Sequence, residues 1–258
     1  MDKRMSGALR GAPALGFFAS KTTATYTDMD LPAHYEAMRA IAQRQLVQGQ
    51  ADLDRLLDSP LDDRRGITLL TRPPAAITDV IARIIADFQI DEPAQYYYPT
   101  SDIHLTILSI ISCYRGFTLD LISPQAYREG VGAILQRTRP FAIRFAGFTA
   151  SPGGIMVQGF PEDDGLQTLR DELRQFFQGT GLQQSIDQRY RIQTAHSTVI
   201  RFRSPLRDPG AALAKLARYQ HYAIGTFMVD SLELVYNDWY QRMENTTLLE
   251  RYSLRPTP

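Results

Sequence analysis

The first part of the chain carries apolar residues at the spacing of a helix. They run from Tyr35 to Leu46, after a helix start at Asp30 and before an interruption at Gly49. A charged stretch at 62–65 follows, and the strand patterns begin only beyond it. We therefore expect residues 1–63 to form an N-terminal tail and a helical extension.

Beyond this stretch, patterns typical of strands and of amphipathic helices alternate along the chain. The expected strands are 67–70, 103–111, 141–148, 155–160, 194–202, 229–236 and 248–254. The expected helices are 77–88, 125–136, 166–177 and 211–219. The succession predicts a fold of mixed α and β class. Each half offers a histidine-bearing strand, then a helix, then further strand material, which indicates two similar lobes facing one another.

Composition narrows the possible partners. The apolar content of 44% and the charged content of 22% are ordinary for a folded chain. The 28 basic and 28 acidic residues leave no positive field for long nucleic acid, so duplex DNA or RNA is not an expected partner. Cys113 is the single cysteine and cannot form an internal disulfide, which favours a reducing compartment such as the cytoplasm. No apolar run is long enough to span a membrane, so we expect no membrane partner. We also expect the protein to be a monomer.

Two short motifs carry the candidate chemistry. Two of the four histidines are followed two positions later by threonine, in His104-Leu105-Thr106 and His196-Ser197-Thr198. Side chains two apart on a strand project from one face, so each strand presents an imidazole and a hydroxyl together. A single motif of this kind is usually structural, whereas the pair indicates a functional site.

The paired motifs have a known counterpart. Ile103-His104-Leu105-Thr106-Ile107 and Ala195-His196-Ser197-Thr198-Val199 resemble the His-x-Thr/Ser-hydrophobic motifs of the two-histidine (2H) phosphoesterase superfamily. That superfamily includes the RNA 2′,3′-cyclic phosphodiesterases, also called 2′-5′ RNA ligases. The resemblance implies an α+β fold for residues 64–258, with two pseudo-symmetric lobes of antiparallel sheet, helices outside and an active-site groove between the lobes.

The resemblance also implies an activity. It implies metal-independent, cofactor-free cleavage of a phosphodiester in a small nucleotide or at an RNA end, either a 2′,3′-cyclic phosphate or a 2′-5′ linkage. His104 and His196 would exchange the protons, since their ordinary pKa lies near neutrality, and Thr106 and Thr198 would bind the phosphate oxygens. The alternative is a non-catalytic module that binds a nucleotide or RNA end in the same groove.

Further residues are weaker candidates for substrate contacts. The ring of Tyr98 lies shortly before the first motif strand, and the rings of Tyr236 and Trp239 lie near the end of the second lobe. Each could stack on a base, although core packing is the commoner use of such rings. Arg144 shares a strand face with small residues and is a candidate groove residue. Arg201 is expected to face away from His196, because it lies an odd number of positions from it, unless a bulge intervenes.

Other reaction classes find no support in the sequence. Cys113 follows an apolar run and is expected to be a buried thiol rather than a nucleophile. The sequence has no P-loop, no G-x-S-x-G motif, no H-E-x-x-H motif and no cysteine cluster. These absences argue against nucleoside triphosphate hydrolysis, serine-hydrolase chemistry and structural zinc.

Overall fold

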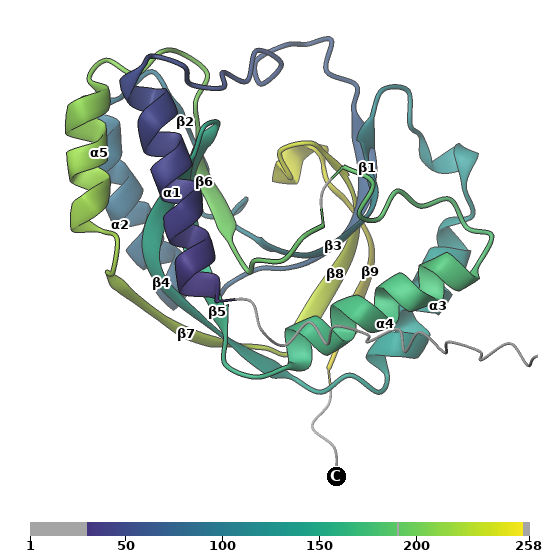
Figure 1. Cartoon of the computed structure of the whole chain (residues 1–258). Helices are drawn as coiled ribbons and strands as arrows, with labels where there is room; N and C mark the ends of the chain where they lie inside the picture. Colours follow the sequence, from purple (N-terminus) through teal and green to yellow (C-terminus); the bar gives the residue numbers. More distant parts are fainter. Residues whose placement is uncertain (1–29, 190, 255–258) are drawn as a thin grey trace, which may run out of the picture. The chain divides into compact units, whose positions relative to one another are not determined.

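The structure, a computed structural model, describes residues 30–189 and 191–254. In this part of the chain two antiparallel sheets are flanked by helices (Figure 1). The α-helices are α1 (Leu31–Val47), α2 (Ala75–Asp91), α3 (Pro124–Leu135), α4 (Gly165–Gly179) and α5 (Pro209–Arg218), with short 3₁₀ helices η1 (Leu119–Leu121) and η2 (Met243–Asn245). The strands are β1 (Arg65–Thr71), β2 (Tyr96–Tyr97), β3 (Leu105–Tyr114), β4 (Phe141–Ser151), β5 (Gly154–Pro161), β6 (Ser197–Arg201), β7 (Ala223–Val229), β8 (Ser231–Asp238) and β9 (Thr247–Ser253).

The strands form one sheet with the order β3-β1-β8-β9 and a second with the order β2-β6-β5-β4-β7. Every neighbouring pair is antiparallel. One histidine motif belongs to β3 of the first sheet and the other to β6 of the second. The predicted α+β fold with two lobes of antiparallel sheet is confirmed.

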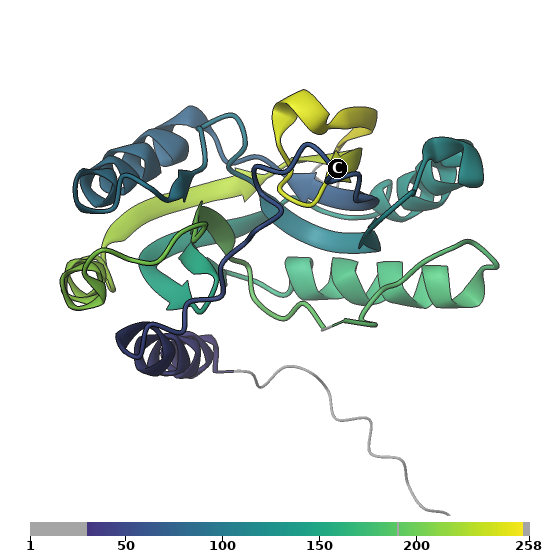
Figure 2. The same cartoon turned by 90° about the horizontal axis from the view of Figure 1, so that it is seen from above.

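The helices divide between the sheets. Helices α1 and α5 pack on β4 and α2 packs on β7, whereas α4 packs on β3 and α3 on β9. Helices α3 and α4 also pack on each other, as the view in Figure 2 shows. The sequence of α4 explains why this helix packs on a sheet. One stripe of the helix is apolar and buried, because apolar residues recur every three or four positions, at Leu166, Leu169, Leu173 and Phe177.

The chain crosses between the sheets more than once. Strands β1 and β3 pair in the first sheet, and β4, β5, β6 and β7 lie in the second. The chain then returns, because β8 pairs with β1 and β9 pairs with β8. Each motif strand pairs with a strand that precedes it in the sequence: β3 pairs with β1, and β6 pairs with β5. Neither sheet is therefore a continuous piece of sequence.

Helix α1 lies within the compact unit, which begins at Leu31. Its Tyr35, Ala42 and Leu46 are buried, and they pack the helix against β4. The expected boundary at residue 63 therefore falls inside this unit. The expected helix of the extension is present at the predicted place.

The other elements lie close to the predicted ranges, and two strands are not predicted, the short β2 and β7. A single strand was expected at 229–236, and the structure has two strands, β7 and β8, on either side of Asp230. Strand β7 contains Gly225, and its buried residues are Ile224, Phe227 and Val229. Its alternation is interrupted at Gly225, which explains why the pattern is weak.

Candidate active site

One cleft contains both histidine motifs. It holds about 980 Å³ of empty space, including space open to solvent. Its walls come from both sheets and from the segment before β6, and its lining residues are Thr68, Tyr98, His104, Thr106, Leu108, Ser109, Ser112, Cys113, Ser185, Asp187, Arg189, Ile192, His196, Thr198, Arg201, Asn237, Trp239, Tyr240 and Gln241. The four motif residues predicted from the sequence therefore line one cleft.

The motif residues hold matching places on their strands. His104 directly precedes β3 and His196 directly precedes β6, so each imidazole stands at the entrance of its strand. Thr106 and Thr198 follow on the same sides and are partly exposed in the cleft. Their hydroxyls have no hydrogen-bond partner among the described residues, which leaves both available to a ligand.

A backbone carbonyl anchors His104. Its Nδ1 lies 2.7 Å from the carbonyl oxygen of Asp102. A carbonyl oxygen only accepts, so Nδ1 carries the hydrogen and the neutral ring keeps its lone pair on Nε2. The Asp102 carboxylate in turn accepts hydrogen bonds from Ser101 Oγ at 2.8 Å and from the backbone N–H of Met243 at 3.2 Å. The residue that orients the imidazole is thus itself fixed.

A side-chain hydroxyl anchors His196. Its Nδ1 lies 2.6 Å from Oγ1 of Thr194, which is buried. A hydroxyl can donate or accept, so this contact by itself is compatible with either tautomer of the neutral ring. Both anchors lie two residues before the histidine that they hold.

Both imidazoles are neutral in the free protein at neutral pH. Burial lowers the pKa of His104 and of His196 from 6.5 to about 4. Nearby positive charge lowers the pKa of His196 further, from Arg170, Arg201 and His34. A neutral imidazole can act as a base. An anion bound in the cleft would raise the pKa of both imidazoles and so favour protonation of one of them.

Arg170 of α4 ties the two motif strands together. It is 1% exposed. Its Nε donates to the carbonyl of Ile107 at 2.8 Å, and its Nη2 donates to the carbonyls of Thr106 and Thr194, each at 3.0 Å. Burial lowers the pKa of this guanidinium to about 9. One side chain therefore fixes the spacing of β3 and of the segment that carries His196.

Arg170 is a site residue that the sequence analysis does not predict, although its position in the sequence carries a signal. The residue lies four positions after Leu166 and three before Leu173, on the apolar stripe of its helix. A buried arginine needs several acceptors, and such a position indicates a structural or functional network.

Arg201 lies in the cleft, and the expectation that it faces away is wrong. The ladder between β5 and β6 shifts register: Ile155 is opposite Ile200, whereas Met156 is opposite Thr198. The extra residue, Val199, forms a bulge that returns Arg201 to the side of Thr198. Sequence reading could not locate the bulge, because nothing in the residue types at this point requires it.

Comparisons with known proteins found structures of similar architecture but no match by sequence. No family model matches the sequence, and no curated protein matches it. TT0787 of Thermus thermophilus is 16% identical, and its structure matches over 74% of this chain and 98% of that chain with a TM-score of 0.51. E. coli LigT complexed with 3′-AMP is 15% identical, over 75% and 99% of the chains, with a TM-score of 0.47. The conserved protein of unknown function ATU0111 from Agrobacterium tumefaciens is 17% identical, over 81% and 98%, with a TM-score of 0.48.

The chain has the fold of TT0787, with two antiparallel sheets flanked by helices. The match to TT0787 spans nearly all of that protein and leaves about a quarter of this chain uncovered. This chain thus has that fold with additional segments.

Two of the aromatic candidates lie in the cleft. Tyr98 is buried, and its hydroxyl accepts a hydrogen bond from Arg201 Nε at 2.8 Å. Trp239 is partly exposed and has two guanidinium groups near its ring centroid, that of Arg189 at 4.5 Å and that of Arg64 at 5.0 Å. The indole is the better placed of the two rings for stacking, because Tyr98 is covered.

The other two candidates lie outside the cleft. Arg144 lies on β4, pairs with Glu162 at 2.7 Å and lines a separate hollow beside α1. Tyr236 donates its hydroxyl to the carbonyl of Phe117 at 3.0 Å. Side chains alternate along β8, and Asn237 is the residue that faces the cleft, so Tyr236 points to the opposite face of the sheet. Arg144 is therefore not in the groove where it was a candidate, and Tyr236 follows the core-packing alternative.

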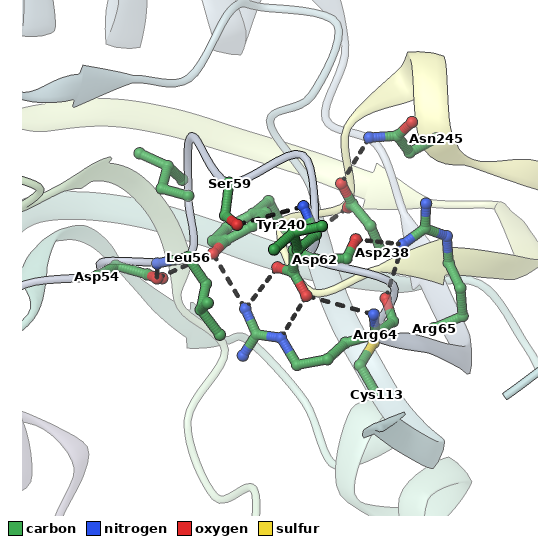
Figure 3. Close-up of polar contacts among 12 residues, drawn as sticks. Asp54, Leu56, Ser59, Asp62, Arg64, Arg65, Cys113, Asp238, Tyr240 and Asn245 are labelled. Carbon is green, nitrogen blue, oxygen red and sulfur yellow. Dashed lines mark hydrogen bonds and ion pairs between the residues drawn. The ribbon is translucent and has the colours of Figure 1, made fainter. Parts of the chain in front are cut away.

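The segment between α1 and β1 borders the site. The Tyr240 hydroxyl, at the cleft, donates to Asp54 at 2.9 Å and accepts from Arg64 at 3.0 Å (Figure 3). Arg64 also pairs with Asp62 at 2.7 Å. The backbone N–H of Asp54 donates to the carbonyl of Phe202, just after β6. The extension thus joins both sheets beside the cleft.

Cys113 lines the same cleft but is 8% exposed, and burial raises the pKa of its thiol to about 12. The expected buried thiol is what the structure has. Among the described ranges, no three His, Cys, Asp or Glu side chains gather closely enough to hold a metal ion. None of the helices in those ranges is long and apolar enough to cross a membrane.

Proposed function

We propose that this protein is a phosphodiesterase that cleaves a small nucleotide or RNA-end phosphodiester, either a 2′,3′-cyclic phosphate or a 2′-5′ linkage. The observation that carries the proposal is the convergence of two His-x-Thr motifs, one from each sheet, on one cleft. An in-line displacement at phosphorus needs proton transfer on two opposite sides of the phosphate. A site with one imidazole on each wall meets that need.

The reaction divides between the two histidines. In hydrolysis of a cyclic phosphate, one imidazole accepts a proton from water through Nε2 while the water oxygen bonds to phosphorus. The bond from phosphorus to the leaving oxygen breaks, and the second histidine, as the imidazolium, gives its proton to that oxygen. His104 suits the first task, because its Nδ1–H is held by a carbonyl and its Nε2 lone pair is free. The rings exchange roles in the reverse direction.

The remaining groups of the cleft suit a phosphate anion. The unpartnered hydroxyls of Thr106 and Thr198 can donate to the non-bridging oxygens, where charge develops during the displacement. Arg201 adds a positive charge on the same wall as Thr198. The anion itself favours protonation of an imidazole whose pKa the free protein holds at about 4. The scheme assigns no step to a metal ion.

The alternative is a binding module that holds a nucleotide or an RNA end without turnover. Its support is the same lowered pKa, since neutral imidazoles can act as hydrogen-bond partners without transferring protons. Turnover decides between the two functions.

The test is incubation with 2′,3′-cyclic nucleotides and short 2′-5′-linked oligonucleotides in excess EDTA, with product identification by chromatography. We expect cleavage by the wild type and loss of most activity in His104→Ala and in His196→Ala. The matched control is His221→Ala, because His221 is exposed and lies outside the cleft. Binding without cleavage would favour the alternative, and activity that disappears in EDTA and returns with a metal ion would contradict the metal-independent scheme.

A further inference from the structure

Two side-chain amides of the cleft have a carbonyl oxygen without a hydrogen-bond partner. Asn237 is 1% exposed and Gln241 is 7% exposed, and both line the cleft that contains the histidine motifs. Their Oδ1 and Oε1 atoms are buried and accept no hydrogen bond from the described residues. A buried acceptor without a donor is costly. A ligand that brings N–H groups to these two oxygens would therefore be stabilised in the cleft.

The amide of Asn237 has a fixed orientation. Its Nδ2 donates to the carbonyl oxygen of Asp238 at 2.7 Å, and a carbonyl oxygen can only accept. Turning the amide over would place two acceptors against each other, so Oδ1 stays on the other side. Asn237 therefore presents an acceptor, and not a donor, to a ligand that reaches it.

Asp238 holds the loop that carries both amides. Its carbonyl oxygen also accepts from the backbone N–H of Gln241 at 3.3 Å. Its carboxylate accepts from the backbone N–H groups of Tyr240 and Arg242, at 3.0 and 3.1 Å, and from Nδ2 of Asn245 at 3.0 Å (Figure 3). Gln241 has a φ of 61°, which a residue with a side chain rarely adopts and which such contacts maintain. The loop is thus fixed in its shape before a ligand binds.

The chemistry of the loop matches a nucleobase. Trp239 lies between the two amides in sequence, and its ring lines the cleft. An aromatic ring stacks on the face of any base, whereas an amide recognises the edge. The amino group of adenine or cytosine supplies two N–H donors, enough for both oxygens. Hypoxanthine and uracil carry a carbonyl oxygen at that position and would leave an acceptor unpaired.

We propose that residues 237–241 form a base-recognition subsite that selects nucleotides of adenine or cytosine, through an amino group at the position where hypoxanthine and uracil carry a carbonyl oxygen. The inference rests on the function proposed above in one respect, because it requires a nucleotide in the cleft. It requires no turnover, so binding and cleavage test the two proposals separately.

Trp239 makes this binding measurable without turnover. It is the single tryptophan of the chain, so tryptophan fluorescence reports on this loop. The experiment titrates the wild type with 3′-AMP against 3′-IMP and with 3′-CMP against 3′-UMP, two pairs that differ at the amino or carbonyl group. We expect 3′-AMP and 3′-CMP to bind about tenfold or more tightly than their partners, because an unpaired polar group at a base edge weakens binding by at least this order.

Variants of the two amides test the assignment. Gln241→Met keeps the length of the side chain, Asn237→Leu keeps the branched shape, and both remove the acceptor. Each should reduce the preference for the amino-bearing base and leave the affinity for 3′-IMP nearly unchanged. The matched control is Gln158→Met, which removes a buried amide outside the cleft whose Nε2 donates to the carbonyl of Phe148 at 3.2 Å. If Asn237→Leu does not fold, Gln241→Met and the wild-type pairs decide.

Each outcome decides. Equal affinity of the wild type for 3′-AMP and 3′-IMP and for 3′-CMP and 3′-UMP, or a preference that survives in both amide variants, would overturn the subsite. The same loss of preference in Gln158→Met would also overturn it. A wild type that binds 3′-AMP with the expected preference but cleaves no substrate would support the subsite and contradict the phosphodiesterase. If no nucleotide binds, both proposals fail.

Discussion

One extra residue in β6 determines which arginine side chain enters the cleft. The bulge at Val199 places Arg201 beside Thr198, whereas Arg203 pairs with Asp58 and lies outside. We expect Arg201→Gln to raise KM for a phosphodiester by about tenfold or more, because a charge-assisted contact to an anion is worth roughly 1.5–3 kcal/mol. Arg203→Gln, the matched control, should leave KM unchanged. Equal effects of the two variants would show that only net charge matters.

The hydroxyls of the two motifs can be tested separately from their shape. Thr106→Val and Thr198→Val keep the branched side chain and remove the donor that would meet the phosphate oxygens. Loss of one donor to developing charge lowers kcat on the order of a hundredfold. Steady-state kinetics, with thermal denaturation to check folding, measure this. Wild-type kinetics in both variants would assign the threonines to strand formation alone.

The lowered pKa values of the two histidines predict how rate depends on pH. The free protein holds both at about 4, and the acid must be protonated to donate. A bound phosphate anion raises these pKa values. Since kcat/KM reports the free enzyme and kcat reports the complex, the alkaline limb of kcat should lie at higher pH than that of kcat/KM. Profiles on a 2′,3′-cyclic nucleotide measure both, and coincident limbs would contradict the stabilisation of the proton by substrate.

At this scale the sequence predicts what depends on spacing and misses what depends on backbone irregularity. The four motif residues could be found because strand alternation puts positions two apart on one side. The same rule failed for Arg201, where a bulge intervenes. For Arg144 the rule correctly separates its face of the strand from that of Phe145. That face lies beside α1 and not at the cleft, so the residue is no groove residue. Which face borders the cleft depends on the packing of whole elements.

Among the elements, α1 has the most direct test. Leu46 is 2% exposed and packs in the core, whereas the neighbouring Val47 is 64% exposed. Leu46→Ala should lower the free energy of unfolding by about 2–5 kcal/mol, because it removes buried methyl groups and leaves a cavity. Val47→Ala should change it by less than about 0.5 kcal/mol. Denaturant melts measure both, and a small effect of Leu46→Ala would mean that the helix is a separable attachment.

The elements themselves were largely predictable, because long amphipathic segments such as α2 and α4 carry clear periodicity. Strand β7 was not separated from β8, since Gly225 interrupts its alternation. The sheet to which a strand belongs could not be predicted from local pattern. Strand β8 pairs with β1, which lies about 160 residues earlier in the sequence, and β9 then pairs with β8. Tertiary packing sets these pairings.

For the whole molecule, the buried histidines link stability to acid. Each has an ordinary pKa of 6.5 and a folded-state pKa of about 4. As pH falls from about 6.5 to about 4, the unfolded chain takes up protons on these rings and the folded protein does not, so the free energy of unfolding decreases. The double variant His104→Gln/His196→Gln should lose stability less steeply in this window. Denaturant midpoints at several pH values measure it, and identical slopes would refute the linkage.

The return of the chain to its first sheet has a consequence for synthesis. During translation β1 and β3 leave the ribosome early, yet one edge of β1 has no partner until β8 has been made. An unpaired strand edge is prone to pair with other chains. The wall that holds His104 therefore matures late, and the nascent protein has to protect an open sheet edge while the other wall, with His196, is already complete.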